Sequence, residues 1–407
     1  MQLQKFDVII VGAGPAGTST AIRLGGSGLK VALLDKENFP RDKTCGDALS
    51  VDVVDQLSKL SDGLPAEFEV FASKLPSYGV KIFSPDHRFI DIPFIYNNTK
   101  RCGYICPRKD FDNLLFQHVR RYRNVQIFEN CSVNKVIRDN SKLLLKTSIG
   151  DLEGQMIIGA DGAHSVIAKN LSKIKVEKEH YSAGLRVYYE QITGFHHENY
   201  IELHFFKDIL PGYLWIFPLK DNVANVGIGM LSSMVSKKNV NMRETLQKLL
   251  KTSPHLQERF LSARPLENIK GFGLPLGSKK RTLSGERFLL AGDAASLIDP
   301  FSGEGIANAI RSGRVAADHV IRCFQEQDFS TDFNKAYDKE IYQRMWKEFR
   351  VSRSLQRLVK YSSLFNFLIK KANRNKHLHD FFTQALANVD QKKLLTKPSF
   401  YYRMFFK

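Results

Sequence analysis

FDVIIVGAGPAG, from Phe6 to Gly17, is an apolar strand that runs directly into a glycine turn of the form G-x-G-x-x-G. Gly12 lets the chain turn sharply out of the strand, Gly14 leaves room for a diphosphate beside the backbone, and Gly17 lets the next helix lie close to the strand. The helix expected over residues 18–24 presents free N–H groups and the positive end of its dipole to that diphosphate. The stretch therefore predicts a dinucleotide site.

A second strand completes the nucleotide-binding unit. Lys30–Leu34 is apolar and ends at Asp35, 18 residues after Gly17, where a carboxylate is placed to accept hydrogen bonds from an adenosine ribose. We expect Ala16 in the turn and Lys36 beside the acid to contact the same nucleotide. Strand, turn, helix, strand and acid in this order are much more specific than the glycine pattern alone.

Two segments much later in the chain indicate what the nucleotide carries. RFLLAGDAA, residues 287–295, is a strand that leads to Asp293, whose carboxylate is suited to accept from a ribityl hydroxyl. The Pro- and Gly-rich turn that follows opens a helix near residues 303–306, where backbone N–H groups stabilise negative charge on a reduced isoalloxazine ring. The residues expected to hold the cofactor here are Gly292, Asp293, Pro300, Gly303, Gly305 and Ile306.

A middle segment, IIGADGAHSV at residues 157–166, contains Asp161 and Gly162. With the other motifs, in their order and spacing, it makes the chain resemble the FAD-dependent oxidoreductases of the p-hydroxybenzoate hydroxylase type. The resemblance covers most of the first 320 residues and implies bound FAD, contacted also by Asp161 and Gly162. It implies an α/β fold in which a Rossmann-type FAD-binding domain carries an inserted antiparallel-sheet substrate domain and a C-terminal helical segment.

Two further stretches resemble the geranylgeranyl reductases within that group. FPRDKTCGDALS (39–50) is similar to their P-R-x-K-x-C-G-G-x-L stretch, and YLWIFP (213–218) is similar to their Y-x-W-x-F-P motif. One position departs, because Asp47 stands where many members carry Gly. The second motif also resembles the W-x-W-x-I-P of flavin halogenases, but Tyr213 replaces its first Trp, which favours the reductases. The resemblance implies saturation of prenyl double bonds.

These motifs supply candidates for the site beyond the glycine turn. The resemblance places four residues near the flavin: Arg41, Cys45, Gly46 and Arg108. Four are candidates for substrate contact or proton delivery: Cys45, Asp47, Tyr213 and Trp215. Each has a structural alternative: burial as a small apolar residue for the cysteine, sheet packing for the two aromatic residues, and a solvated first helical turn for Arg108.

The sequence contains no second dinucleotide turn, so NAD(P)H or another electron donor is expected to dock transiently. Cys102 and Cys106 have a C-x-x-x-C spacing, but no further Cys pair or His cluster completes four ligands. We therefore expect FAD as the resident cofactor and no metal site.

Alternation of apolar and polar residues marks a second domain. Residues 78–83 and 89–92 alternate around a turn, and strand-like stretches predominate between residues 177 and 280. We expect a discontinuous FAD-binding domain (1–75, 105–176 and 281–335), a substrate domain (76–104 and 177–280) and a basic helical C-terminal segment (336–407).

The charge is concentrated in that last segment. The net charge is +18, and the final 67 residues hold fifteen Lys or Arg against three acidic residues, mixed with aromatic side chains up to Ser399–Lys407. Two interpretations remain open: helices that contact an anionic membrane surface, or a solvated helical cap over the FAD-binding domain. An apolar prenyl-type substrate in a bilayer agrees with the first. No nucleic-acid partner is expected, because no RNA-binding motif is present.

The remaining composition bears on the compartment. No run of about 18 apolar residues occurs, so no membrane-spanning helix is expected. The first strand begins at the N-terminus, which leaves no room for a signal peptide, and five scattered cysteines suit a reducing compartment. We expect a cytoplasmic protein, with any membrane association on the cytoplasmic face.

Three functions are consistent with these features. The first is reduction of C=C bonds in the prenyl side chain of a lipid, quinone or pigment, which the segments around Cys45 and Trp215 favour. The second is a flavin monooxygenase that acts on an aromatic or polyketide-like molecule, since one fold hosts many chemistries. The third, with least support, is an RNA-directed or non-redox flavoprotein.

Overall fold

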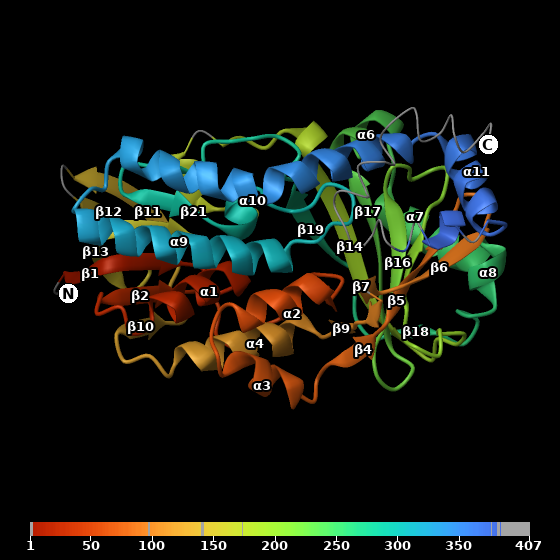
Figure 1. Ribbon diagram of the computed structural model, residues 1–407, viewed down its shortest axis with the longest axis horizontal. Coiled ribbons are helices and arrows are strands. Elements are labelled where there is room, and N and C mark those ends of the chain that lie inside the picture. Colours follow the sequence, from red (N-terminus) through yellow and green to blue (C-terminus); the bar gives the residue numbers. More distant parts are fainter. Residues whose placement is uncertain are drawn as a thin grey trace.

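The computed structural model describes residues 3–96, 98–139, 142–172, 174–375, 377–380 and 383. They form two large sheets with helices packed against them (Figure 1). The first sheet has parallel strands β10 (Val125–Phe128), β2 (Val31–Leu34), β1 (Gln4–Val11), β13 (Gly150–Gly159) and β21 (Phe288–Leu290). Antiparallel strands β12 (Lys142–Thr147), β11 (Val133–Asp139) and β20 (Ser284–Gly285) extend it.

Several helices cover the first sheet. They are α1 (Pro15–Leu24), α2 (Val51–Ser58), α3 (Leu64–Glu69), α4 (Arg108–Val119), α5 (Val166–Leu171), α9 (Ile306–Glu326) and α10 (Thr331–Leu358). α1 begins before the predicted position 18, because Pro15 is suited to a first helical turn. A Cβ at Gly313 of α9 would lie 2.2 Å from the carbonyl oxygen of Ala16, so the two helices pack at backbone distance.

The second sheet is mostly antiparallel. Its strands are β18 (Arg264–Pro265), β14 (Tyr181–Glu190), β17 (Ala224–Leu231), β16 (Tyr213–Pro218), β15 (Ile201–His204), β5 (Gly79–Phe83) and β6 (Phe89–Pro93), with β19 (Lys270–Pro275) paired to β14. Alternation in β16 sends Leu214 and Ile216 into a buried core that includes Leu246 and Leu250 of α7 (Met242–Thr252). Tyr213 and Trp215 therefore face the other side, toward the first sheet.

Smaller elements connect the two sheets. β3 (Ala48–Leu49), β9 (Gly103–Ile105) and β4 (Leu75–Ser77) form one small sheet, and β7 (Ile95–Tyr96) pairs with β8 (Thr99–Lys100). The remaining helices are α6 (Ser232–Lys238), α8 (Pro254–Gln257) and α11 (Ser362–Ala372), with short 3-10 turns η1 (Lys178–His180) and η2 (Gly292–Ala295). The proposed domain boundaries stay a prediction, and the one at residue 336 falls inside α10.

The described part of the C-terminal segment packs onto the protein. Tyr337, Ile341 and Phe349 of α10 are buried in the core of the first sheet, and Phe365 and Ile369 of α11 are buried beside the second. Their apolar side chains are thus covered by the protein itself. The aromatic end, Ser399–Lys407, lies outside the described residues. Within the described ranges, no helix combines the length and apolar character needed to cross a membrane.

We predict that Phe349→Ala lowers the free energy of unfolding by about 3–5 kcal/mol, because the ring is 1% exposed and packs against Gly277. Tyr361→Ala is the control, since that side chain is 69% exposed and its loss should change stability by less than about 0.5 kcal/mol. Denaturant unfolding of both variants tests whether α10 belongs to the core. Equal stabilities would show that α10 is an appendage.

Candidate functional site

The glycines of the turn meet two different requirements, which are close packing at Gly12 and Gly17 and open space at Gly14. At Gly12, φ is +99° and a Cβ would lie 2.4 Å from the carbonyl oxygen of Ala160. At Gly17, a Cβ would lie 1.7 Å from the carbonyl oxygen of Gly12, so α1 can approach β1 only without a side chain there. At Gly14 the nearest atom is Nη2 of Arg41, 3.6 Å away. The space beside Gly14, at the start of α1, is thus the cradle that a diphosphate requires.

Asp35 ends β2 beside this turn. Its Oδ2 accepts from the backbone N–H of Ala13 at 2.7 Å and its Oδ1 from the N–H of Glu37 at 2.9 Å. The carboxylate therefore fixes the glycine turn in addition to any contact with a ribose. Lys36 points outward, since its side chain is 73% exposed and its nearest charged partner is Glu37.

The middle motif supports the turn from the other side. Asp161 accepts hydrogen bonds from Ser165 Oγ at 2.5 Å and from the backbone N–H of Val166 at 2.6 Å. Burial raises the pKa of Asp161, and these hydrogen bonds oppose that rise. Its carboxylate is thus engaged at the start of α5, and the cofactor contacts expected of Asp161 and Gly162 stay predictions.

The segment after β21 forms a second cradle. A Cβ at Gly292 would lie 3.0 Å from Ala16 Cβ, and one at Gly305 would lie 3.6 Å from Oδ1 of Asp293. The start of α1 therefore lies beside Asp293 and the N-terminus of α9, which begins at Ile306.

Asp299 shapes the turn from Pro300 to Gly303. It accepts from the backbone N–H groups of Phe301 and Ser302. The carbonyl oxygen of Pro300 accepts from Nε2 of Gln356, at 2.5 Å, so α10 also holds this turn.

Buried charges organise the side of the site that carries Cys45. Asp112 is fully buried and accepts from Arg108 twice at 2.7 Å and from Arg41 at 3.0 Å. Burial alone would raise the pKa of Asp112, but the charge and hydrogen bonds of Arg108, together with the charges of Arg41 and Lys43, lower it below its usual value. The solvated alternative for Arg108 is wrong, because its side chain is 7% exposed. Arg41 is the cation closest to the open space at Gly14.

Lys43 is a site residue that the sequence analysis did not select. Its ammonium lies 3.6 Å from the ring centre of Phe272, and burial lowers its pKa although the carboxylate of Asp293 opposes this. The P-R-x-K spacing contained the signal, but a lysine in a loop gives no indication of burial. The structure brings this cation to the segment expected at the flavin ring.

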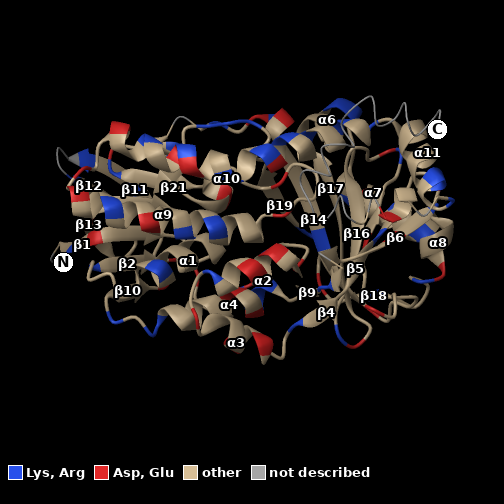
Figure 2. Ribbon diagram, in the orientation of Figure 1, with Lys and Arg blue, Asp and Glu red and all other residues tan. Residues whose placement is uncertain are grey.

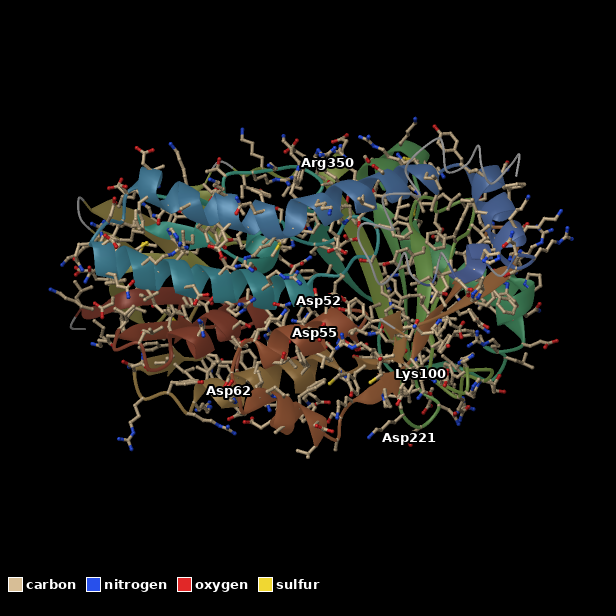
Figure 3. The ribbon with its side chains drawn as sticks, viewed as in Figure 1. Asp52, Asp55, Asp62, Lys100, Asp221 and Arg350 are labelled. Atoms are coloured by element: carbon tan, nitrogen blue, oxygen red, sulfur yellow. The ribbon has the colours of Figure 1, made fainter. Side chains whose placement is uncertain are left out.

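An ion pair connects the Cys45 segment to α9. α2 follows that segment directly, and Asp52 of α2 pairs with Arg311 of α9 at 2.5 Å. Asp55, one turn later, pairs with Arg101 at 2.6 Å. Figure 3 shows both acidic residues projecting from this helix.

An apolar pocket lies between the second sheet and the turn after Asp293. It is lined by Ser182, Gly184, Pro211, Gly212, Tyr213, Trp215, Gly229, Met230, Leu231, Leu274, Leu276, Asp299, Pro300, Phe301, Gly303 and Gln356. Of the described residues that line it, none is Lys, Arg or His. The hydroxyl of Tyr213 donates to the carbonyl oxygen of Ser302, which joins the sheet to the turn, and burial raises the pKa of Tyr213.

Trp215, which lines the pocket, and the Cys45 segment meet at Asn225. Nε1 of Trp215 donates to Oδ1 of Asn225 at 2.9 Å, and a Cβ at Gly46 would lie 2.9 Å from the ring of Phe217. Gly46 therefore allows the segment to lie on the second sheet. Cys45 is only partly buried and its thiol lies close to the Arg108 guanidinium, and its contact with substrate stays a prediction.

Asp47 does not face the pocket in the way a proton donor requires. It is 0% exposed, and its Oδ2 accepts from Tyr188 Oη at 2.5 Å and from Asn225 Nδ2 at 2.7 Å, while Oδ1 accepts from the backbone N–H of Arg108 at 3.2 Å. Burial raises the pKa of Asp47 to about 6, against the effect of these donors. This geometry corrects the expectation of substrate contact: the side chain positions its neighbours.

One group of potential metal ligands stands outside these motifs. Ligand atoms of His196, His197 and Glu198 lie within 4.8 Å of one another. Glu198 already pairs with Lys100, and none of the three lines the apolar pocket. The cluster therefore takes no part in the site described above.

Comparison with known proteins identifies the cofactor. A sequence model of the FAD binding domain family matches residues 5–350. The digeranylgeranylglycerophospholipid reductase 2 of Methanosphaera stadtmanae is 30% identical over 82% of this chain and 82% of its own. The menaquinone reductase of Mycolicibacterium smegmatis is 25% identical over 95% of this chain and 92% of its own. A geranylgeranyl bacteriochlorophyll reductase-like protein from Thermoplasma acidophilum shares the fold, with a TM-score of 0.78, 22% identity and 91% coverage of both chains.

These matches confirm the predicted fold class and FAD as the cofactor. The two cradles fit that group, because the start of α1 has open space at Gly14 and the Asp293 segment with the start of α9 lies beside it. The individual cofactor contacts remain predictions.

We predict that Gly14→Ala and Gly17→Ala separate cofactor binding from folding. A methyl group at position 17 would overlap the backbone of Gly12, so the FAD-free Gly17→Ala protein should lose about 3 kcal/mol of stability or more. A methyl group at position 14 meets only Arg41, so Gly14→Ala should cost less than about 1 kcal/mol yet weaken FAD binding by about tenfold or more. Denaturant unfolding and FAD titration measure the two effects. An unaltered FAD affinity in Gly14→Ala would show that the diphosphate does not bind in this space.

We also predict a pH-dependent stability difference between wild type and Asp47→Asn. A carboxyl with a raised native pKa, here about 6 against 3.8, binds its proton more tightly in the folded state. Wild-type stability should therefore fall relative to the variant as the pH rises from 4 to 7, by up to about 3 kcal/mol. Unfolding curves of both proteins across this range give the difference, and a difference independent of pH would show that Asp47 titrates normally.

Proposed function

This chain belongs to the FAD-binding family and is an oxidoreductase of the geranylgeranyl reductase type, and we propose that it saturates C=C bonds in the prenyl chain of a lipid or quinone. The carrying observation is the apolar pocket between β16 and the Pro300–Gly303 turn. Among the described residues that line it, the charged one is Asp299, which accepts hydrogen bonds from backbone N–H groups of its own turn. Such walls favour an uncharged hydrocarbon segment.

In this proposal, residues of the chain bind and orient the cofactor and form the walls that shield the substrate. The glycine turn and Arg41 hold the diphosphate, and Asp293 and the start of α9 hold the ring end of FAD. FAD, when reduced, supplies hydride to the substrate. Tyr213 and Trp215 form pocket walls, and the hydrogen bond from Tyr213 to Ser302 closes the pocket at that side.

Proton delivery is assigned to Sγ of Cys45. Asp47 is buried with both carboxylate oxygens occupied, and the phenol of Tyr213 already donates to a backbone carbonyl. Cys45 is partly exposed and lies beside Arg108, so it does not share the full burial of Asp47.

Two partners complete the proposal. NAD(P)H or another donor reduces the flavin after transient docking. The prenyl substrate is presented by an anionic membrane surface. That surface is attracted by basic residues on α6 and α11 (Figure 2), such as the exposed Lys237, Lys238 and Lys370.

The test mixes anaerobically reduced, FAD-loaded protein with a geranylgeranyl phospholipid in anionic or neutral vesicles. We expect substrate-dependent return of the oxidised flavin absorbance, faster with anionic vesicles, and a product heavier by whole pairs of hydrogens. Cys45→Ala should retain FAD but slow this step by about 10²-fold.

Return of the absorbance only with oxygen, together with hydroxylation of an aromatic compound, would establish the monooxygenase alternative. Equal rates with both kinds of vesicle would remove the membrane part of the proposal.

A further inference from the structure

Asn225 lies at the junction of Trp215 and the Cys45 segment. It is a fully buried residue of β17, and its amide makes three hydrogen bonds. Oδ1 accepts from Nε1 of Trp215 at 2.9 Å, and Nδ2 donates to the carbonyl oxygen of Cys45 at 2.8 Å and to Oδ2 of Asp47 at 2.7 Å. One amide thus contacts three residues that the sequence motifs selected separately.

The chemistry of these partners fixes the direction of the amide. An indole N–H can only donate, a backbone carbonyl can only accept, and an ionised carboxylate can only accept. A reversed amide would face a donor with its NH2 group and two acceptors with its oxygen. Since the site is buried, each mismatch would leave a polar group without a partner.

Trp215 depends on this anchor because glycines surround its ring. A Cβ at Gly227 would lie 2.1 Å from the indole, and Cβ atoms at Gly229 and Gly46 would lie 3.7 and 3.5 Å from it. These glycines make room for the ring but add no side chains to hold its angle. The hydrogen bond to Asn225 uses the one donor that the indole has.

We propose that Asn225 is a positioning residue, which sets the angle of Trp215 against the apolar pocket and the position of Cys45 with the same amide. The kinetic part of this inference rests on the proposed prenyl reduction. The spectroscopic part rests only on the geometry of Trp215.

The charges around the amide determine what an acid would do in its place. Asp47 is faced by Tyr188 and Arg186 from β14, by the backbone N–H of Arg108 from α4, and by the thiol of Cys106. Asn225→Asp would add a second buried carboxylate beside Asp47 and a repulsion with the carbonyl oxygen of Cys45. Two such carboxylates hold one proton between them, so the variant should regain the native arrangement only at low pH.

The experiment uses FAD-loaded protein with Trp346→Phe, so that Trp215 is the one tryptophan left. In this background, Asn225→Leu should increase acrylamide quenching of Trp215 at least about twofold. It should also raise KM for the prenyl lipid roughly tenfold with a smaller change in kcat. Asn225→Asp should show quenching that rises between pH 5 and 8, where the parent stays constant.

Asn334→Leu is the matched control, because Asn334 is also a fully buried asparagine but bonds to the carbonyl oxygen of Gly285 in the other domain. It should lower stability without changing Trp215 quenching. Unchanged quenching in both Asn225 variants would overturn the inference, whatever the substrate proves to be. If Asn225→Leu does not fold, the pH response of the isosteric Asn225→Asp decides.

Discussion

The fold depends on one backbone contact, in which the first turn of α1 lies against the glycine turn. The carbonyl oxygen of Gly12 occupies the place that a side chain at position 17 would need, and α9 approaches the same turn through Gly313. Two helices and a strand thus converge at backbone distance, and the Thr20 hydroxyl of α1 donates to the carbonyl oxygen of Gly313 between the helices. The convergence leaves the N–H groups of α1 facing open space at Gly14, and it brings the distant Asp293 segment to the same place. Binding of the cofactor therefore requires that both α1 and α9 lie close to the glycine turn.

Buried charge is the second constraint, and the chain meets it by pairing. Asp112 accepts from two arginines, and Arg186, with its side chain 1% exposed, pairs with Asp42 and Glu267. Unpaired charges at these positions would cost several kcal/mol each. The pair of Arg41 with Asp112 connects the Cys45 segment to α4, and the pair of Asp42 with Arg186 connects it to β14. Arg41, which lies beside the open space at Gly14, therefore also fixes the Cys45 segment.

The sequence predicted features whose cause is local. A glycine turn between an apolar strand and a helix predicts the dinucleotide turn, and the motif at 213–218 selected Tyr213 and Trp215, which both line the pocket. Burial was not predictable, because it depends on residues far away in the chain. The sequence does not show that the Lys43 ammonium lies over the ring of Phe272 or that the Asp47 carboxylate accepts from Asn225, because both partners are far away in the chain. Asn225 itself has no motif, since its role exists only when three segments meet.

Asp47 shows how a departure from a family pattern is accommodated. Its φ of +66° lies in the left-handed region that glycine adopts freely, so the backbone retains the conformation that a glycine would give there. The added carboxylate is buried, and three donors from β14, β17 and α4 are needed to stabilise it. Because one of those donors is the amide that also orients Trp215, the substitution ties the loop to the pocket wall more tightly than a glycine can. The unusual residue therefore acts through the shape of the site, since both of its oxygens are already occupied.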